Sequence, residues 1–536
     1  MILIYKKSGK LHKITKSNED VEISGGFENN RVIYDVKAKS DISLVSATIY
    51  QEDRVKRGNL YFFNGYQSWT DSREISPHRI ETNVYRIPKA ILFSNHLQMY
   101  GDATFYKYRA RRLHGYDVFY IKGPNECFVY NLNAKNAYLV FTLEKLSRKI
   151  NVKSDVKNIN LKIGEEVRVF DFKAFSSIKE GLENFDKDFP KLNKEKIFGY
   201  TSWYNYYQNI NEKIIIRDLK ALDSRFNLFQ IDDGYQTKVG DWLSINKEKF
   251  PNGLAPIVET IHKKGFKAGI WLAPFVAQKD SMLVKEHPEY FKKVKGKFVN
   301  CGANWGGFYA LDVFNKEAMN YVKKCLEHYM DMGFDFFKLD FLYACNLPAY
   351  EGYSRSQVAE RSYQFIRDIL KDKLILGCGA TLSNAAKRFD YLRIGTDVSL
   401  SFNDTFIMRQ LHRERPSTKY TIQNTIYRSF LNDHFFGNDP DVFLLRDENI
   451  SLSDKQKESL LTINALFGSV LMCSDDIATY EEKNKALLEK ALDIFYHSSD
   501  KSFKKISRRY VKVKYTLNGE EHKFKYNVLK GEITNG

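Results

Sequence analysis

The chain of 536 residues has few cysteines and no CxxC pair among them. The cysteines are Cys127, Cys301, Cys325, Cys345, Cys378 and Cys473. Thiols scattered in this way exclude a zinc ribbon, an iron-sulfur centre and a disulfide scaffold. The pattern is typical of a protein from a reducing compartment.

Long apolar runs are also lacking. The amino terminus has only a very short apolar run before its first lysines, too short for a signal peptide. No later stretch approaches the length of a membrane span. We therefore expect a soluble, cytoplasmic protein without a membrane partner.

Acidic residues are too few to balance the basic ones, and the formal net charge is +17. A basic surface can bind nucleic acid through phosphate contacts. Lysine and arginine are, however, spread along the chain, and the clusters at 292–297 and 504–509 lie beside no helix-turn-helix or RNP pattern. A general lysine-rich bias explains the charge more simply, so we expect no nucleic-acid partner.

What the chain does have is material for a large core, since 43% of its residues are hydrophobic and 15% are aromatic. A chain of this size is expected to form several domains. Residues 1–175 alternate apolar and polar positions, which predicts an antiparallel β-sandwich. A helix-like stretch, Pro190 and a lysine-rich run then predict a helical linker over 176–196.

From residue 197 short apolar strands alternate with helical patterns. The candidate strands are 198–203, 228–232, 267–271, 335–340, 374–378, 391–394, 434–437 and 469–474. The helical patterns between them include 212–225, 254–264, 354–371 and 453–466. This alternation predicts a multidomain α/β protein with a central (β/α)8 TIM barrel over 197–495. The tail, 496–536, alternates again and predicts a small carboxyl-terminal β-domain.

The candidate strand around residue 338 reads Phe-Phe-Lys-Leu-Asp-Phe and carries Lys338 and Asp340 on one face. In an α/β barrel the carboxyl ends of the strands converge on one mouth, which carries the chemistry. An ionisable pair at such a strand end indicates a functional site. The alternative is an internal salt bridge with a structural role.

Carboxylates are concentrated at the ends of the candidate strands. They are Asp232, Asp233, Asp340, Asp397, Asp439, Asp441, Asp475 and Asp476. Converging carboxylates bind Mg²⁺ or Ca²⁺ in some proteins, and in others they hydrolyse glycosides as nucleophile, proton donor and hydroxyl ligands. A metal site has no need of aromatic residues, whereas rings stack on the apolar faces of sugars.

Aromatic residues do lie among these acids, namely Trp203, Tyr204, Tyr235, Trp242 and Trp271. Each ring alone could be ordinary core packing, but several rings beside acids at strand ends favour a sugar site. Trp305 lies on a later loop and could serve as a sugar platform or as packing.

Cationic neighbours separate the roles of two acids. Lys338 shares a strand face with Asp340 and is expected to keep that carboxylate ionised, as a nucleophile must be. Arg393 precedes Asp397 by four residues, so we expect a turn between them and no direct pairing. A carboxylic acid without a close cation keeps its proton more readily and suits the role of general acid.

Seven motifs occur in an order that is familiar. They are Ile231-Asp-Asp-Gly-Tyr-Gln, Gly240-Asp-Trp, Phe250-Pro-Asn-Gly-Leu, Gly269-Ile-Trp-Leu-Ala-Pro, Phe337-Lys-Leu-Asp-Phe, Arg393-Ile-Gly-Thr-Asp and Asn438-Asp-Pro-Asp. With these motifs the chain resembles glycoside hydrolase family 36, the α-galactosidases, and most of all its compact prokaryotic members. The resemblance runs from Asn64-Gly-Tyr-Gln-Ser-Trp to Ser474-Asp-Asp.

The resemblance implies that Asp340 is the nucleophile and Asp397 the acid/base. It also implies that Asp232 and Asp233 bind the 4- and 6-hydroxyls of galactose. The other residues it brings to the sugar are Lys338 and Arg393 at ring hydroxyls, Trp203, Tyr204 and Trp271 as walls, Trp69 from the amino-terminal domain, and Cys378 and Gly379 at the 2-position.

The chain departs from the family pattern at two places. Tyr200 and Tyr235 stand where the family commonly has Trp, which keeps an aromatic surface. In the loop that faces the 2-position, Gly379 and Ala380 are small, so a bulkier 2-acetamido group is not excluded. An α-N-acetylgalactosaminidase is therefore an alternative.

We thus expect a retaining exo-α-galactosidase that needs no metal or organic cofactor and whose partner is a small-molecule galactoside, with a homo-oligomer possible. Its two catalytic carboxyl groups should lie about 5–5.5 Å apart. A galactosyltransferase of the raffinose-synthase kind is a second alternative. A carbohydrate-binding or nucleic-acid-binding protein without turnover is a third, from a different class.

Overall fold

The computed structural model describes the chain except for residues 55, 57, 77–99, 103–105, 107–111, 145–148, 190–194, 348, 387, 405–412 and 536. Pro190 and most of the lysine-rich run of the expected linker therefore lie outside the described residues. The expected helix before them is present as α1 (Ile178–Asp188), which begins after the capping side chain of Ser177.

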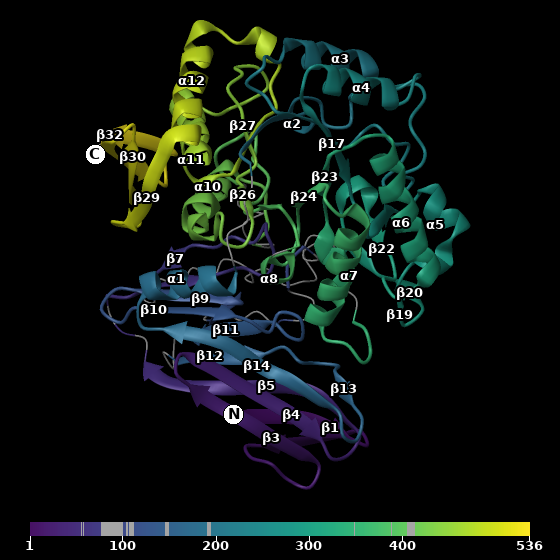
Figure 1. Cartoon of the computed structure of the whole chain (residues 1–536), viewed down its shortest axis with the longest axis vertical. Coiled ribbons are helices and arrows are strands. Elements are labelled where there is room, and N and C mark those ends of the chain that lie inside the picture. Colours follow the sequence, from purple (N-terminus) through teal and green to yellow (C-terminus); the bar gives the residue numbers. More distant parts are fainter. Residues whose placement is uncertain are drawn as a thin grey trace.

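Two antiparallel sheets form the amino-terminal part of the chain, at the lower end of the molecule in Figure 1. The first has the order β2 (Lys10–Ile14), β1 (Ile2–Lys7), β5 (Ile42–Arg54), β12 (Lys149–Ser154), β11 (Leu139–Glu144) and β8 (Arg112–Tyr116), with β13 (Asn160–Leu161) also on β5. The second has the order β3 (Val21–Glu28), β4 (Arg31–Ala38), β14 (Glu166–Phe175), β10 (Cys127–Asn131), β9 (Val118–Lys122), β6 (Leu60–Phe63) and β7 (Glu74–Ile75).

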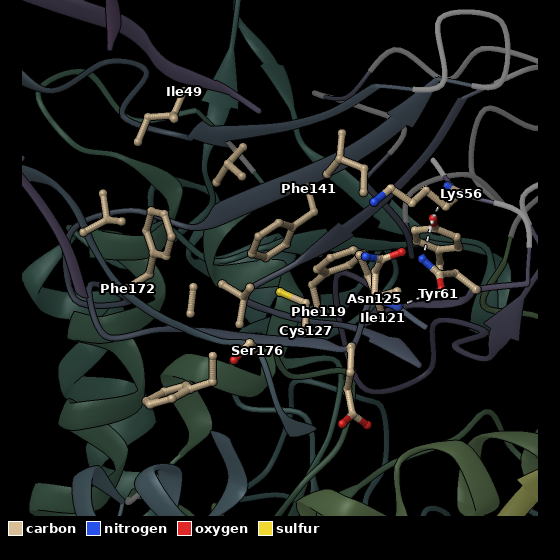
Figure 2. Close-up of a pocket in the computed structure, with 18 of the residues that line it drawn as sticks. Ile49, Lys56, Tyr61, Phe119, Ile121, Asn125, Cys127, Phe141, Phe172 and Ser176 are labelled. Carbon is tan, nitrogen blue, oxygen red and sulfur yellow. Dashed lines mark hydrogen bonds between the residues drawn. The ribbon is translucent and has the colours of Figure 1, made fainter. Parts of the chain in front are cut away.

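Apolar side chains of both sheets meet between them, as the alternation in the sequence predicts. Phe119 of β9 stacks on Phe141 of β11, with 5.2 Å between the ring centroids. Beside these rings lies a cavity of 470 Å³, whose lining includes Tyr61 and Asn125 (Figure 2). None of the residues expected at the active site lines this cavity.

A parallel sheet follows and contains the expected strands. Its order is β26 (Gly437–Asp439), β25 (Tyr391–Arg393), β24 (Leu374–Gly377), β23 (Phe336–Leu339), β17 (Lys267–Leu272), β16 (Leu228–Ile231), β15 (Ile197–Thr201), β28 (Val470–Cys473) and β27 (Val442–Phe443). Strands such as β16 and β23 are buried along their whole length, which explains their continuous apolar runs.

The seventh candidate strand was expected at 434–437, and the structure corrects this position. Strand β26 begins only at Gly437, and Pro440 separates it from β27. Proline has no N–H to donate, so it interrupts the strand. The apolar residue Phe435 packs instead against Phe185 of α1, with 3.9 Å between the ring centroids.

Helices lie between the strands of the parallel sheet in the sequence, and one more, α12, follows its last strand. They are α2 (Trp203–Tyr206), α3 (Glu212–Ala221), α4 (Ala255–Lys263), α5 (Met282–Glu286), α6 (Lys316–Asp331), α7 (Arg355–Leu370), α8 (Leu382–Ala385), α10 (Thr418–Tyr427), α11 (Asp454–Phe467) and α12 (Glu482–His497). The start of α7 is a capping box, in which the side chains of Ser354 and Gln357 each accept from the other residue's backbone N–H.

A small sheet is inserted between β17 and α6. It has the order β18 (Val276–Gln278), β22 (Phe308–Ala310) and β21 (Asn300–Gly302), and the hairpin of β19 (Lys293–Val294) and β20 (Lys297–Phe298) lies within it in the sequence. The insertion explains the extra length before the fourth candidate strand.

The carboxyl-terminal sheet comprises β29 (Ser498–Lys505), β30 (Tyr510–Leu517), β31 (Glu520–Asn527) and β32 (Glu532–Asn535). It lies beside α11 and α12, in yellow in Figure 1. Among the residues that the structure describes, no helix has both the length and the apolar character needed to cross a membrane.

Candidate active site

Asp340 directly follows β23 and is fixed from two sides. Its Oδ2 accepts a hydrogen bond of 3.0 Å from Nε1 of Trp271, at the end of β17, and its Oδ1 accepts one of 2.8 Å from the backbone N–H of Phe341. Phe341 has a φ of 54°, a left-handed value that is strained for a bulky side chain. Burial raises the pKa of Asp340 to about 6; Lys338 opposes this shift and the charge of Asp397 adds to it.

Lys338 does not pair with Asp340 as the sequence predicted. Its Nζ lies 2.8 Å from Oδ2 of Asp232, which follows β16. Burial acts to lower the pKa of Lys338, but the surrounding groups, chiefly the charge of Asp232, together outweigh it and the pKa is raised. In a parallel sheet, side chains on one face can contact side chains of other strands. The spacing of Lys338 and Asp340 along one strand therefore did not identify the partner of Lys338. The charge of Lys338 acts on Asp340 from a distance and lowers the pKa of that carboxyl group.

Asp233 accepts hydrogen bonds from three side chains. The Nε2 atoms of Gln236 and Gln208 lie 2.5 Å and 2.9 Å from its oxygens, and Nε1 of Trp305 lies 3.1 Å away. Burial raises the pKa of Asp233, while these donors act to lower it. Trp305 thus belongs to the acid cluster, and Gln208 was missed because nothing in its sequence context marks it.

Arg393 and Asp397 form a direct ion pair, which corrects the expectation that Asp397 is unpaired. Nη1 of Arg393 lies 2.9 Å from Oδ1 of Asp397. The same guanidinium reaches Oδ2 of Asp439 at 2.9 Å and Oδ1 of Asp441 at 2.8 Å. The turn after β25 is tight enough to bring residues four apart together. Asp397 nevertheless keeps 46% of its side chain exposed.

Asp441 lies beneath this ion pair and also accepts from the hydroxyl of Tyr204 and from the backbone N–H of Val398, at 2.7 Å. Burial raises its pKa to about 7; Arg393 opposes the shift, and Asp397 and Asp439 add to it. Neither Asp439 nor Asp441 was assigned a site role from the sequence. The Asn438-Asp-Pro-Asp motif was the available signal.

The aromatic residues divide into two groups. Trp271 and Tyr204 are held at the acids by the hydrogen bonds described above, and Trp203 lies beside Tyr204 in α2. Tyr235 is fully buried and donates to the backbone oxygen of Trp271 at 3.0 Å, so it supports the site from behind. Trp242 likewise packs edge-on behind Trp271.

Trp69 reaches the strand ends from the amino-terminal part, as the resemblance implied. Its ring packs edge-on against Phe341 with 5.3 Å between centroids, and its Nε1 is buried without a hydrogen-bond partner among the described residues. Gly379 follows the buried Cys378, and a Cβ on Gly379 would lie 3.3 Å from Cη2 of Trp69. The structure therefore gathers these three residues beside Asp340.

Asp475 and Asp476 are not part of this cluster. Asp475 pairs with Arg446 at 2.8 Å and accepts from the hydroxyl of Tyr480, and Asp476 caps a turn through Ala478. Both carboxylates stabilise the chain after β28. Within the described part of the chain, no group of three or more His, Cys, Asp or Glu side chains is arranged to hold a metal ion.

Comparisons with known proteins identify the relatives of this site. Residues 192–376 match the model of the melibiase family. The α-galactosidase Mel36A of Lactobacillus acidophilus is 27% identical over 243 residues, which are 39% of this chain and 32% of Mel36A. The A type blood α-D-galactosamine galactosaminidase of Flavonifractor plautii is 32% identical over 153 residues, 26% of this chain and 14% of that one. The chain thus spans about a third or less of these relatives' length.

A solved structure extends the likeness over the whole chain. TtGalA, an α-galactosidase from Thermus thermophilus in complex with p-nitrophenyl α-D-galactopyranoside, superposes with a TM-score of 0.71 at 22% identity, over 97% of this chain and 98% of TtGalA. At this identity the likeness establishes the fold. The resemblance to glycoside hydrolase family 36 is confirmed, because residues 192–376 match the melibiase family and the whole chain has the fold of an α-galactosidase.

Proposed function

We propose that the chain is a retaining exo-α-galactosidase that hydrolyses terminal α-D-galactosyl residues of galacto-oligosaccharides. The observation that carries the proposal is the pair Asp340 and Asp397, two carboxylates close enough for the charge of one to raise the pKa of the other. One is fixed by Trp271 and Phe341, and the other is half exposed on Arg393. Double displacement needs one carboxylate as nucleophile and a second as acid/base, and the fixed Asp340 and the more exposed Asp397 suit these roles in that order.

In the first step an oxygen of Asp340 attacks C1 of the galactosyl group while Asp397 donates its proton to the departing oxygen. The bond from C1 to that oxygen breaks, and a covalent galactosyl-Asp340 forms. In the second step Asp397 takes a proton from water, the water oxygen bonds to C1, and Asp340 departs as carboxylate.

The other residues hold the sugar in this proposal. Asp232 and Asp233 accept from the 4- and 6-hydroxyls, and Lys338 and Arg393 donate to ring hydroxyls. Among the described residues the buried Nε1 of Trp69 has no hydrogen-bond partner. This supports a contact with the substrate, because a buried donor without a partner is costly. Trp203, Tyr204 and Trp271 are proposed as the walls, and Cys378 and Gly379 as the residues at the 2-position.

We also propose that the parallel sheet closes as a (β/α)8 barrel. Its outer strands β26 and β27 are separated only by Pro440 and Asp441, so one stretch of chain pairs with β25 at one end and with β28 at the other. The proposed domains are the β-sandwich over 1–175, the linker over 176–196, the barrel over 197–495 and the β-domain over 496–536. Because α12 ends at His497, the last sheet begins just after that final boundary.

A substrate panel with wild type and Asp340→Ala tests the function. We expect wild type to hydrolyse melibiose, raffinose and p-nitrophenyl α-galactoside, and Asp340→Ala to lose at least about a thousandfold in kcat. Proton NMR of the first product should show α-galactose. Near-normal activity of the variant, or β-galactose as the first product, contradicts the mechanism.

The alternative at the 2-position is an α-N-acetylgalactosaminidase. The small residues Gly379 and Ala380 favour it, but the indole of Trp69 fills the space beside Gly379 and leaves little room for an acetamido group. We therefore expect the p-nitrophenyl α-galactoside to be cleaved faster than the corresponding α-N-acetylgalactosaminide. The transferase alternative, the cytoplasmic location and the oligomeric state stay predictions.

A further inference from the structure

We propose that the exposed ring of Tyr207 forms the subsite for the leaving group, where it stacks on the sugar ring that is joined to galactose through the bond to be cleaved. This inference rests on the proposed function and adds a residue that recognises the second sugar. Three observations carry it, namely the position of the ring, its charged neighbours and the strain of its backbone.

Tyr207 lies next to residues at the mouth of the candidate site. It directly follows α2, in which the hydroxyl of Tyr204 bonds Asp441 and the ring of Trp203 meets that of Tyr207. The two rings meet edge to face, with 5.2 Å between centroids and an angle of 86°. Tyr204 is 3% exposed, whereas Tyr207 is 42% exposed. The same short segment thus presents one ring to the buried acids and another to the open side.

Tyr204 bonds Asp441, and Arg393 pairs with both Asp441 and Asp397, so the segment that carries Tyr207 lies on the Asp397 side of the site. Burial raises the pKa of Tyr207, with Arg446 acting against the shift and Asp397 adding to it. The hydroxyl of Tyr207 therefore lies within the field of the proposed proton donor. In a retaining glycosidase the proton donor stands beside the departing oxygen. A leaving sugar needs a proton donor at the departing oxygen and a surface for its ring. The half-exposed Asp397 and the exposed ring of Tyr207 can supply these two on the same side of the site.

The backbone of Tyr207 is strained. Its φ of 49° and ψ of −132° are a combination that glycine adopts readily and that a bulky side chain rarely does. The N–H of Tyr207 donates to the backbone oxygen of Trp203 at 2.6 Å and holds the turn in this shape. Because much of the ring is exposed, its packing contributes little stabilising free energy to offset the strain. Strain of this kind is concentrated at functional sites.

The test compares substrates that share the galactosyl group and differ in the leaving group. Melibiose releases a sugar that can stack on Tyr207, whereas α-galactosyl fluoride releases only fluoride. We expect Tyr207→Gly to lower kcat/KM for melibiose by about 3- to 10-fold and to leave that for the fluoride within about twofold. Tyr207→Phe, which keeps the ring, should retain most of the melibiose activity.

Two controls separate recognition from folding. Tyr207→Gly relieves the strained φ, so its thermal midpoint should equal or exceed that of wild type. Tyr353 is equally exposed, at 42%, and packs against Phe314 before α7. Tyr353→Ala should leave both substrates unaffected.

Two outcomes overturn the inference: an equal loss of activity on melibiose and fluoride, or unchanged melibiose activity in Tyr207→Gly. If wild type hydrolyses neither substrate, the proposed function itself fails and the subsite falls with it.

Discussion

Asp340 is held in a place that favours its neutral form, although its proposed role requires the anion. The cause is burial and the nearby Asp397, which together outweigh Lys338 and bring the pKa to about 6. The two donors at its oxygens, Trp271 and the N–H of Phe341, act in the opposite direction. The pKa of the nucleophile is therefore set by opposing influences, of which burial is the largest.

The acid limb of the pH profile should report this balance. With α-galactosyl fluoride, kcat/KM should fall about tenfold per pH unit below about pH 6, as Asp340 gains its proton. Trp271→Phe removes a hydrogen bond to the charged form, so it should raise the pKa of Asp340 by up to about one unit. The limb then moves to higher pH. A limb that stays in place or moves to lower pH in this variant contradicts the assignment.

Asp340 should also lower the stability of the fold at neutral pH. Its folded pKa of about 6 exceeds the ordinary value of 3.8, so the folded state binds more protons between these values and stability falls as pH rises through them. Asp340→Asn removes the buried charge. We expect a gain of about 1–3 kcal/mol at pH 7, seen as a higher thermal midpoint that converges with wild type toward pH 4. A midpoint below that of wild type at pH 7 contradicts this reading.

At the scale of elements, the turns after β23 and β24 decide the shape of the mouth. Phe341 and Gly379 both have a positive φ, and the hydrogen bond from the N–H of Tyr343 to the oxygen of Gly379 joins the two turns at 2.7 Å. A Cβ at position 379 would lie 3.2–3.3 Å from Tyr343, Phe341 and Trp69. The absence of a side chain here lets Trp69 close the pocket.

Gly379→Ala should therefore affect activity as well as stability. We expect it to raise KM for galactosides by about tenfold or more through displacement of Trp69, and to cost about 1–2 kcal/mol in stability. Gly296 is the matched control, because its φ of 75° is similar and a Cβ there meets nothing within 4 Å. Gly296→Ala should lose stability only. Equal kinetics of the two variants contradict the argument.

The strands could be predicted from the sequence more fully than the ion pairs between their side chains. The apolar runs of β16, β17 and β23 gave the strands because a parallel sheet buries both faces, and the acids at their ends followed. The Lys338–Asp232 and Arg393–Asp397 pairs could not be predicted, since the first joins non-adjacent strands and the second depends on the tightness of one turn. The shifted seventh strand had a local cause in Pro440.

At the scale of the whole molecule, Arg428 connects the amino-terminal sheets to the parallel sheet. It is fully buried and donates to the backbone oxygens of Ser68 and Ile394 at 2.5 Å and 2.9 Å, and to Oδ1 of Asn64 at 3.0 Å. Burial lowers its pKa to about 9, so it stays charged at neutral pH. The loop that carries Trp69 is thus anchored by one side chain more than 350 residues away in sequence.

Arg428→Met should uncouple the two parts. Loss of these hydrogen bonds leaves buried carbonyl groups unpaired, and we expect a cost of about 2–4 kcal/mol together with a fall in kcat/KM of about tenfold or more as Trp69 loses its position. Arg367 also bridges backbone oxygens, those of Arg388 and Lys373, but away from that loop. Arg367→Met should lower the thermal midpoint while the folded enzyme keeps its specific activity. Similar kinetics for both variants contradict a role of Arg428 in positioning Trp69.

The inserted sheet has a consequence for the engineering of related enzymes. Val276 and Ala310 are paired across β18 and β22, so the two ends of the insertion lie side by side. It delivers Trp305 to Asp233 through a single hydrogen bond. The insertion could therefore be exchanged for a different loop with matching ends. Such an exchange would change the contacts between Asp233 and its ligand, while the strands of the parallel sheet stay as they are.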